Sequence, residues 1–290
     1  MEKKVFITGI TGKLGSRVCE FYKSKNYLVS GVSIDYPYND DIRDKDKLIR
    51  KIIEYSPDLI IHTAALVDAD YCEIQKEEAY NINFQGTKNV AIACKQVKAF
   101  LINLSSDFVF DGTCGPYYEE DITNPINFYG KTKLDAELML KELLPENHCT
   151  IRTCVLYDWN EKTKPNFVMW LVNNLKAGKV VNIVTDQYAN PTYIPDLVEV
   201  LYSVGENRIN QTIHVCGKDR LNRYEFALKV ADYFGLNKNL IIPTNSFFLN
   251  QIAKRPLSAG LNTKKAEILG LSIKTIDSGL KRLIISASLK

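Results

Sequence analysis

The stretch K-V-F-I-T-G-I-T-G-K-L-G, residues 4–15, decides the fold. Its apolar run Lys4–Thr8 is typical of a strand, glycines follow at positions 9, 12 and 15, and helical spacing continues to residue 25. In such a loop the glycines permit a tight turn, a close approach of backbone to a pyrophosphate, and close helix–strand packing. The helix N-terminus adds free N–H donors. The spacing is G-x-x-G-x-x-G, and an ordinary glycine-rich turn is the alternative. Because a strand precedes and a helix follows, we predict a dinucleotide-binding loop.

Strand-like and helix-like segments alternate through the first half of the chain. Further strand-like runs cover Tyr27–Ser33, Asp58–Ile61, Phe100–Leu104 and Thr150–Leu156, and helical spacing covers Asp44–Tyr55, Glu77–Lys95 and Thr132–Leu144. Such alternation implies right-handed crossovers and a parallel sheet covered on both faces. We therefore predict the α/β class, with a Rossmann-type doubly wound parallel sheet.

The pattern becomes less regular after residue 157. We expect residues 1–157 to form the dinucleotide-binding Rossmann domain, with later segments returning to it. Residues 158–290 are expected to form mainly a smaller C-terminal α/β substrate lobe. Its helical segments are expected at Phe167–Leu175, Asp196–Val204 and Tyr224–Phe234, and its strand-like runs at Val180–Val184 and Thr212–Cys216.

Composition and charge limit the function classes. The chain has 290 residues, is 24% charged and has a formal net charge of +3 without a long block of one sign, so neither nucleic acid nor an anionic membrane is indicated. No apolar run approaches ~18 residues and no signal-peptide pattern precedes the first strand, so we expect no membrane span. The seven cysteines are odd in number and form no C-x-x-C. We therefore expect no disulfide framework, no metal site, and a reducing, cytoplasmic location.

The end of the second strand-like run bears on the choice of coenzyme. It has the sequence V-S-I-D, with Ser33 and Asp35. An acid at this place binds a ribose diol and favours NAD, whereas a hydroxyl with a nearby base suits the 2′-phosphate of NADP. No Arg or Lys lies between Ser33 and Asp41, although Lys13 or Arg17 could approach from the glycine loop. We expect NADPH or NADH as cofactor, with NAD weakly favoured.

Tyr129 and Lys133 form the chain's one Tyr-x-x-x-Lys pair. At i and i+4 the two side chains share a helix face, and Ser106 and Asp107 end the preceding strand-like run. Hydride transfer to a ketone leaves alkoxide character on oxygen, which a positioned acid must protonate. A nearby ammonium lowers the tyrosine pKa, and Ser106 can orient the carbonyl. The alternatives are that Tyr129 and Lys133 are a surface helix pair and that Ser106 and Asp107 cap the end of the strand. Because a predicted dinucleotide-binding loop lies in the same chain, proton delivery is favoured.

These motifs resemble those of the extended short-chain dehydrogenase/reductases, and more closely the dTDP-4-dehydrorhamnose reductase group. The segments that carry the resemblance are H-T-A-A-L-V-D-A-D-Y-C-E (62–73), S-S-D-F-V-F-D-G (105–112), N-P-I-N-F-Y-G-K-T-K-L-D-A-E (124–137), D-Q-Y-A-N-P-T (186–192) and R-P-L-S-A-G-L-N-T-K-K (255–265). The resemblance implies a Rossmann-type domain, a smaller sugar-nucleotide lobe, and reduction of a 4-keto group on a nucleotide-activated deoxysugar.

The resemblance also implies roles for individual residues. Tyr129 is the expected proton donor, Lys133 its tuner and a ribose ligand, and Ser106 stands where the family usually has Thr. The catalytic set is Tyr129, Lys133 and Ser106. The cofactor-binding set is Gly9, Thr11, Gly12, Lys13, Leu14, Gly15, Ser33, Asp41, Ile42, Ala64, Ala65, Leu66, Leu104, Tyr129 and Lys133, in which Asp41 and Ile42 flank adenosine or form a solvated turn. The substrate-binding set is Val67, Ser106, Asp107, Phe108, Tyr129, Val155, Asn166, Gln187 and Arg255.

Several positions depart from the family pattern. The family usually has His-Thr or Tyr-Thr where this chain has Leu66-Val67, Tyr where it has Phe108, and often Trp where it has Val155. We therefore expect a conserved catalytic core with an altered sugar pocket. Arg255 is a candidate partner for a substrate diphosphate, with a plain surface arginine as the alternative.

Three functions remain in competition. The first is an NAD(P)H-dependent 4-ketoreductase of a nucleotide sugar. The second is an epimerase or dehydratase of the same superfamily, although dehydratases usually add acidic catalytic residues and only Asp107 is present beside Ser106. The third is a non-catalytic regulatory subunit that binds a dinucleotide and a partner enzyme. The expected partners are a small-molecule nucleotide sugar and, as an open arrangement, a second copy of the chain.

Overall fold

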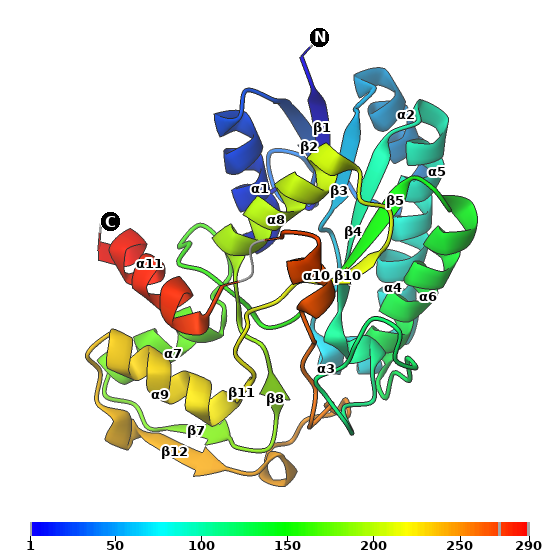
Figure 1. The fold of residues 1–290 in the computed structure, drawn as a ribbon. Helices are drawn as coiled ribbons and strands as arrows, with labels where there is room; N and C mark the ends of the chain where they lie inside the picture. Colours follow the sequence, from blue (N-terminus) through cyan, green and yellow to red (C-terminus); the bar gives the residue numbers. More distant parts are fainter. Residues whose placement is uncertain (1, 272–273, 289–290) are drawn as a thin grey trace.

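The computed structural model describes residues 2–271 and 274–288, and a six-stranded parallel sheet forms its centre (Figure 1). The strands are β1 (Lys4–Thr8), β2 (Leu28–Val32), β3 (Leu59–His62), β4 (Phe100–Ser106), β5 (His148–Thr153) and β10 (Thr212–His214). Their order across the sheet is β10-β5-β4-β3-β1-β2, and each neighbouring pair is parallel. The predicted α/β class and doubly wound parallel sheet are confirmed.

Helices cover both faces of this sheet, with α1 and α8 on one side in Figure 1 and α2, α5 and α6 on the other. Their bounds are α1 (Lys13–Ser24), α8 (Ile194–Asn207), α2 (Lys45–Tyr55), α5 (Thr87–Val97) and α6 (Phe128–Leu143). Successive strand side chains point to opposite faces. In β1, Val5 and Ile7 therefore join the core under α1 and α8, whereas Phe6 joins the core under α2 and α5. All seven residues of β4 are buried, as expected for a strand between two helical layers.

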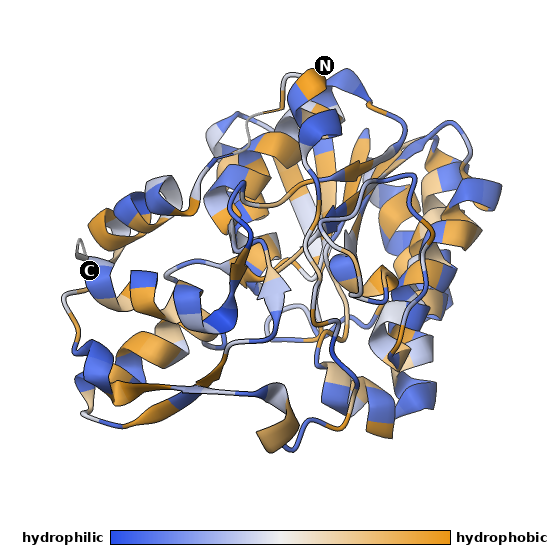
Figure 2. Cartoon of the chain, turned by 60° about the horizontal axis from the view of Figure 1, so that its bottom comes forward, coloured by the Kyte–Doolittle hydropathy of each residue, from blue (hydrophilic) through white to orange (hydrophobic). Residues whose placement is uncertain are grey.

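A second hydrophobic core holds the smaller lobe together. Its elements are β6 (Leu156–Tyr157), α7 (Phe167–Lys176), β7 (Val181–Val184), β8 (Tyr188–Ala189), β9 (Thr192–Tyr193), β11 (Leu221–Asn222), α9 (Arg223–Tyr233), η3 (Lys238–Leu240), β12 (Ile241–Thr244), η4 (Ser246–Phe248) and α11 (Ile276–Ser288). Tyr157, Leu171, Phe226 and Leu280 are fully or nearly fully buried among them. Figure 2 shows the apolar helix faces turned inward in both parts of the chain. Because α8 packs on the main sheet and β10 is one of its strands, residues beyond 158 contribute to both cores.

The long helix expected over Glu77–Lys95 is present and contains a π-helical turn. The structure has α3 (Ala69–Ile74) and α4 (Lys76–Tyr80), then a π-helical turn, η1 (Asn81–Gly86), before α5. The wide turn directs Asn83 toward Leu66, with its Oδ1 accepting from the Leu66 N–H at 2.8 Å and its Nδ2 donating to the Leu66 carbonyl at 3.0 Å. Such turns recur at functional sites because they re-aim side chains.

The ends of two other elements also differ from expectation. β5 stops at Thr153, because Val155 has a positive φ of 48° that a strand cannot continue through. α6 begins at Phe128 rather than Thr132, since the Asn127 side chain accepts from the Gly130 N–H at 2.9 Å and caps it. The remaining elements are η2 (Asp107–Val109) and α10 (Lys264–Ile268). Across residues 2–271 and 274–288, no helix combines the length and apolarity needed to cross a membrane.

Candidate active site

The glycine loop joins β1 to α1 and is tied to the end of β2. The N–H groups of Gly9 and Ile10 donate to the Val32 carbonyl at 2.8 and 3.2 Å. Gly9 has a φ of +66°, and a Cβ on Gly15 would overlap the Gly9 carbonyl, so both positions require glycine. Gly12 begins α1 without a side-chain cap, which leaves first-turn N–H groups for an anion. The loop fits a pyrophosphate.

The segment after β3 is held in place from two sides. The Ala64 N–H donates to Thr8 Oγ1 at 3.3 Å, and Asn83 binds both backbone groups of Leu66. The predicted cofactor segment Ala64–Leu66 is therefore fixed beside β1, while Val67 is 67% exposed. Two residues farther along the loop after β2 were predicted to contact adenosine. Ile42 is buried. The carboxylate of Asp41 instead binds the Arg43 guanidinium at 2.6 Å.

The predicted catalytic residues meet where β4 ends and α6 begins. A Cβ on Gly130 would overlap the Phe108 carbonyl, so this glycine lets α6 approach the strand end. Tyr129 then stands edge-on to the Phe108 ring, with centroids 5.7 Å apart. Ser106 donates to Asp107 Oδ1 at 3.0 Å and accepts from the Phe108 N–H at 3.2 Å. Ser106 also lies near enough to the Tyr129 hydroxyl to act on its pKa.

The pKa values of this pair differ from expectation in one respect. We expected Lys133 to lower the pKa of Tyr129, but burial raises that pKa well above its ordinary value, against the effect of Ser106. Burial also lowers the pKa of Lys133 to about 8, partly opposed by the Glu137 carboxylate. Within the described residues the Lys133 ammonium has no hydrogen-bond or ion-pair partner, and only 3% of the residue is exposed. The protein alone therefore does not activate the tyrosine, and the ammonium keeps its donors for a ligand.

Two arginines approach the same place from the second lobe. Arg223, at the first turn of α9, was missed by sequence reasoning, because the surrounding residues mark only a helix cap. Its guanidinium lies over the Phe167 ring at 5.6 Å and interacts electrostatically with Asp107 and with Arg255. Arg255 binds Asp70 at 2.9 Å, and its buried Nη1 lacks an acceptor among the described residues. Two converging cations with a spare donor form a site for an anion.

Asp107 accepts a hydrogen bond from Ser106 and interacts electrostatically with Arg223. It is 3% exposed, and burial raises its pKa to about 6, while the hydrogen bond from Ser106 and the Arg223 charge act in the opposite direction. Its protonation state is therefore sensitive to whatever occupies the space beside it.

Other predicted substrate residues have different surroundings. Asn166 caps α7 by accepting from the Val168 and Met169 N–H groups at 2.9 and 3.2 Å, and its Nδ2 donates to the Asp158 carbonyl. Its polar atoms are thus occupied within the protein. The Gln187 side chain donates to Gln251. Val155 packs between two hydrophobic cores, and Leu104 is buried in β4.

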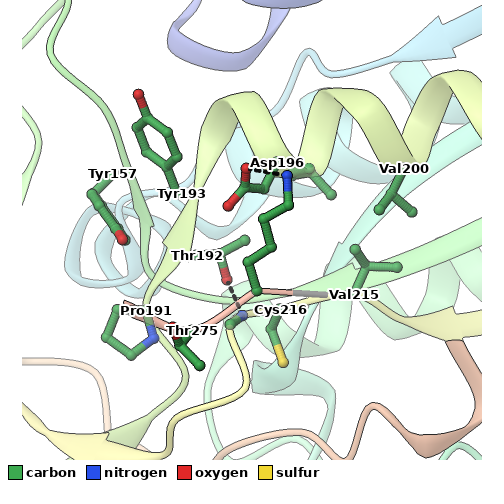
Figure 3. A pocket seen from close by; sticks show the side chains of 12 residues that line it. Tyr157, Pro191, Thr192, Tyr193, Asp196, Val200, Val215, Cys216 and Thr275 are labelled. Atoms are coloured by element: carbon green, nitrogen blue, oxygen red, sulfur yellow. Dashed lines mark hydrogen bonds and ion pairs between the residues drawn. The ribbon is translucent and has the colours of Figure 1, made fainter. Parts of the chain in front are cut away.

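A small cavity lies beside the first turns of α8 (Figure 3). Tyr157, Thr192 and Asp196 contribute to its lining, and Lys274 lies 3.5 Å from the Asp196 carboxylate. Its volume of about 20 Å³ holds little more than one water molecule. The cavity is therefore part of the packing between α8 and the C-terminal segment.

Residues 3–288 match the family model described as the RmlD substrate binding domain. The chain belongs to this family. The resemblance inferred from the motifs is thereby confirmed. Among named relatives, "Methionine adenosyltransferase 2 subunit beta" of Rattus norvegicus is 34% identical over 286 residues, covering 94% of this chain and 84% of its own length. The "Probable low-salt glycan biosynthesis reductase Agl14" of Haloferax volcanii is 29% identical, covering 96% of both chains.

Solved structures agree with this membership of the RmlD family. The dTDP-4-dehydrorhamnose reductase of Bacillus anthracis, crystallised with NADP, superposes with a TM-score of 0.92 at 30% identity and covers 99% of this chain and 100% of its own. The UDP-glucose 4-epimerase of Thermus thermophilus, solved with NAD, has a TM-score of 0.84 at 18% identity, covers 97% of both chains and indicates a shared fold alone.

Proposed function

We propose that this chain reduces the 4-keto group of a nucleotide-activated deoxysugar with NADH or NADPH. The observation that carries the proposal is that Ser106 at the end of β4 and Tyr129 at the start of α6 meet one helical turn from the buried Lys133 ammonium, which has no partner among the described residues. The Bacillus anthracis relative is a dTDP-4-dehydrorhamnose reductase in complex with NADP, and the Haloferax volcanii relative is named a probable glycan biosynthesis reductase. Both support a reductase of this class.

The catalytic groups fit a dinucleotide and a keto-sugar. Reduced nicotinamide, when bound, supplies a hydride to the carbonyl carbon. The Ser106 hydroxyl orients the carbonyl oxygen, and the Tyr129 hydroxyl gives its proton to that oxygen as negative charge develops there. The Lys133 ammonium stabilises the tyrosinate left behind and donates to ribose hydroxyls. The raised Tyr129 pKa in the protein alone suits a proton donor that is held protonated until the charge appears.

The second lobe supplies the nucleotide end of the substrate site. The Arg223 and Arg255 guanidiniums fit a diphosphate, because planar guanidinium groups pair with phosphate oxygens through two parallel hydrogen bonds. Asp107 is an acceptor for a sugar hydroxyl. The exchange of polar for apolar groups at Val67, Phe108 and Val155 supports a sugar other than that of dTDP-4-dehydrorhamnose reductases.

A second candidate is a non-catalytic dinucleotide-binding subunit. The 34% identity to a protein named as a subunit of methionine adenosyltransferase favours it. The presence of Tyr129, Lys133 and Ser106 together favours catalysis, because a protein that no longer catalyses a reaction does not need to keep these residues. The superfamily's epimerase chemistry has only a likeness of fold in its support.

The test is oxidation of NADH and of NADPH, followed by absorbance, against a panel of dTDP-, GDP- and CDP-linked 4-keto-deoxysugars. We expect turnover with at least one sugar, abolished in Tyr129→Phe and retained in the matched control Tyr118→Phe, whose ring is 48% exposed. Full activity of Tyr129→Phe would remove the proton-donor role. No turnover with any sugar of the panel, together with intact dinucleotide binding, would favour the non-catalytic dinucleotide-binding subunit.

A further inference from the structure

A cluster of two hydroxyls and a carboxylate follows the end of β2, next to the glycine loop. Thr11 Oγ1 donates to Asp35 Oδ2 at 2.7 Å and lies 2.6 Å from Ser33 Oγ. From these contacts we infer that Thr11, Ser33 and Asp35 select NADH over NADPH. The inference rests on the dinucleotide site of the proposed function and is independent of the keto-sugar chemistry.

The cluster lies where the two coenzymes differ. In a doubly wound sheet the pyrophosphate sits on the first glycine loop and the adenosine ribose lies at the end of the second strand. Here the Val32 carbonyl at the end of β2 holds the loop through the Gly9 and Ile10 N–H groups. Ser33 follows directly, and the loop residue Thr11 reaches across to Asp35. NADP carries a phosphate on the 2′-oxygen of this ribose, and NAD carries a hydroxyl.

The hydrogens of the cluster all point inward. Each hydroxyl has one hydrogen. Thr11 can donate to Asp35 at 2.7 Å while Ser33 donates to Thr11 at 2.6 Å, or Thr11 can donate to Ser33 while Ser33 donates to Asp35 at 3.5 Å. Both arrangements use the two hydroxyl hydrogens inside the cluster, and the Asp35 N–H donates to Ser33 Oγ at 3.3 Å. A ligand therefore meets lone pairs and a carboxylate. A ribose diol brings the donors that such a surface needs, whereas a 2′-phosphate brings further acceptors and about two negative charges.

Nearby guanidinium groups are committed to other carboxylates. The sequence left open an approach of Arg17, and in the structure Arg17 binds Asp158 at 2.5 Å and Glu20 at 2.9 Å. The interaction holds Arg17 against the segment after β6. Arg43 binds Asp41 at 2.6 Å. Neither guanidinium faces the cluster as a free phosphate ligand.

Two of the nearby ammonium groups are paired with another carboxylate, and a third lies at the start of α1. Lys47 and Lys51 both bind the buried Asp40 carboxylate, at 2.8 and 2.6 Å. Lys13 lies in the first turn of α1, where burial and then the charge of Lys164 lower its pKa. Two like charges at the start of this helix suit the pyrophosphate that NADH and NADPH share. The Bacillus anthracis relative was solved with NADP, whereas the preference inferred here is argued from this chain's own residues.

Calorimetric titration of the intact chain with NADH and with NADPH at one fixed ionic strength tests the inference. We expect NADPH to bind at least about tenfold more weakly than NADH. Asp35→Asn removes the charge at constant size and should reduce the preference for NADH over NADPH at least about threefold. Asp35→Arg should make NADPH the more tightly bound coenzyme. Glu142→Gln, an exposed charge change on α6, should leave the ratio unchanged.

Equal affinities in the unaltered chain, or a ratio unmoved by Asp35→Asn, would overturn the inference, and the Asn variant decides the matter even if Asp35→Arg does not fold. Binding of neither coenzyme would overturn the dinucleotide site and the inference with it. A clear NADH preference without turnover on any keto-sugar would count against the reductase alone and leave the inference standing.

Discussion

The coenzyme half and the sugar half of this site are built by different kinds of contact. Around the coenzyme, backbone groups of neighbouring strands set the geometry, as where the Val32 carbonyl holds the glycine loop. Around the sugar, side chains from distant parts of the chain meet, with Asp107 after β4, Arg223 on α9 and Arg255 beyond η4.

This difference has consequences for substitution. A change in the coenzyme half disturbs close backbone packing, so stability and dinucleotide binding should fall together. A change in the sugar half removes one of several converging side chains, so affinity or substrate choice should change while the fold persists. Of the departures from the family pattern, Phe108 lies edge-on to Tyr129, and Val155 packs between two hydrophobic cores.

The largest effect is expected from Gly15→Ala. A methyl group there overlaps the Gly9 carbonyl, so the loop or α1 must shift. We expect dinucleotide affinity to fall at least about 100-fold and the free energy of unfolding to fall by about 1–3 kcal/mol, measured by calorimetric titration and urea unfolding. Gly178→Ala, which replaces a glycine of positive φ with open space around it, should lower stability alone. Retained affinity in Gly15→Ala would show that the close approach is not required for binding.

Protonation of Asp107 provides a second test, at the border of the two halves. Its pKa is raised from 3.8 to about 6 in the folded chain. As pH rises, the carboxyl loses its proton first in the unfolded chain, so its ionisation destabilises the folded state. This loss of stability grows from about pH 4 and is complete above about pH 6. The stability advantage of Asp107→Asn over the unaltered chain should grow by up to about 3 kcal/mol between pH 4 and 7, by urea unfolding. A flat difference for Asp107→Asn would contradict the raised pKa of Asp107.

The contrast also explains what the sequence could predict. The glycine loop, the strand alternation and the Tyr129–Lys133 pair depend on local spacing, which a single sequence contains. The parallel sheet then follows from general rules of chain connection. The roles of Tyr129, Lys133 and Ser106 remain predictions, since geometry alone brings these residues together without demonstrating turnover.

Contacts between distant segments were beyond such reasoning. Arg223 stands behind a helix-capping Asn222, and nothing in its neighbourhood indicates that the second lobe turns it toward Asp107. Asn166 was assigned to the substrate, but its position before α7 makes it a helix cap. Arg17 looked free because its partner Asp158 lies 141 residues away. Each case depends on how the two cores pack, which residue type and spacing do not specify.

Arg223→Ala should produce a smaller, purely substrate-directed effect. Loss of one of two converging guanidiniums should raise the KM for the accepted nucleotide sugar about 10- to 100-fold, with coenzyme affinity unchanged. Steady-state kinetics with titration of the dinucleotide distinguishes the two. Arg50→Ala, an exposed arginine on α2, serves as the matched control. If Arg223→Ala weakened coenzyme binding by a similar factor, the proposed separation of the coenzyme and sugar halves would be wrong.

The smallest effect, and the sharpest on specificity, is expected from Phe108→Tyr. Phe108 lies edge-on to Tyr129, so the added hydroxyl enters the sugar pocket beside the reacting groups and restores the residue usual in the family. The ratio of kcat/KM for dTDP-4-dehydrorhamnose to that for the accepted sugar should rise about three- to tenfold, because one polar contact is gained by one sugar and a polar group is left unpaired beside the other. Phe247→Tyr, on a ring that is 87% exposed, should leave this ratio unchanged. An unmoved ratio in Phe108→Tyr would mean that the pocket's specificity lies with Val67 and Val155, or with the lobe that carries Arg223.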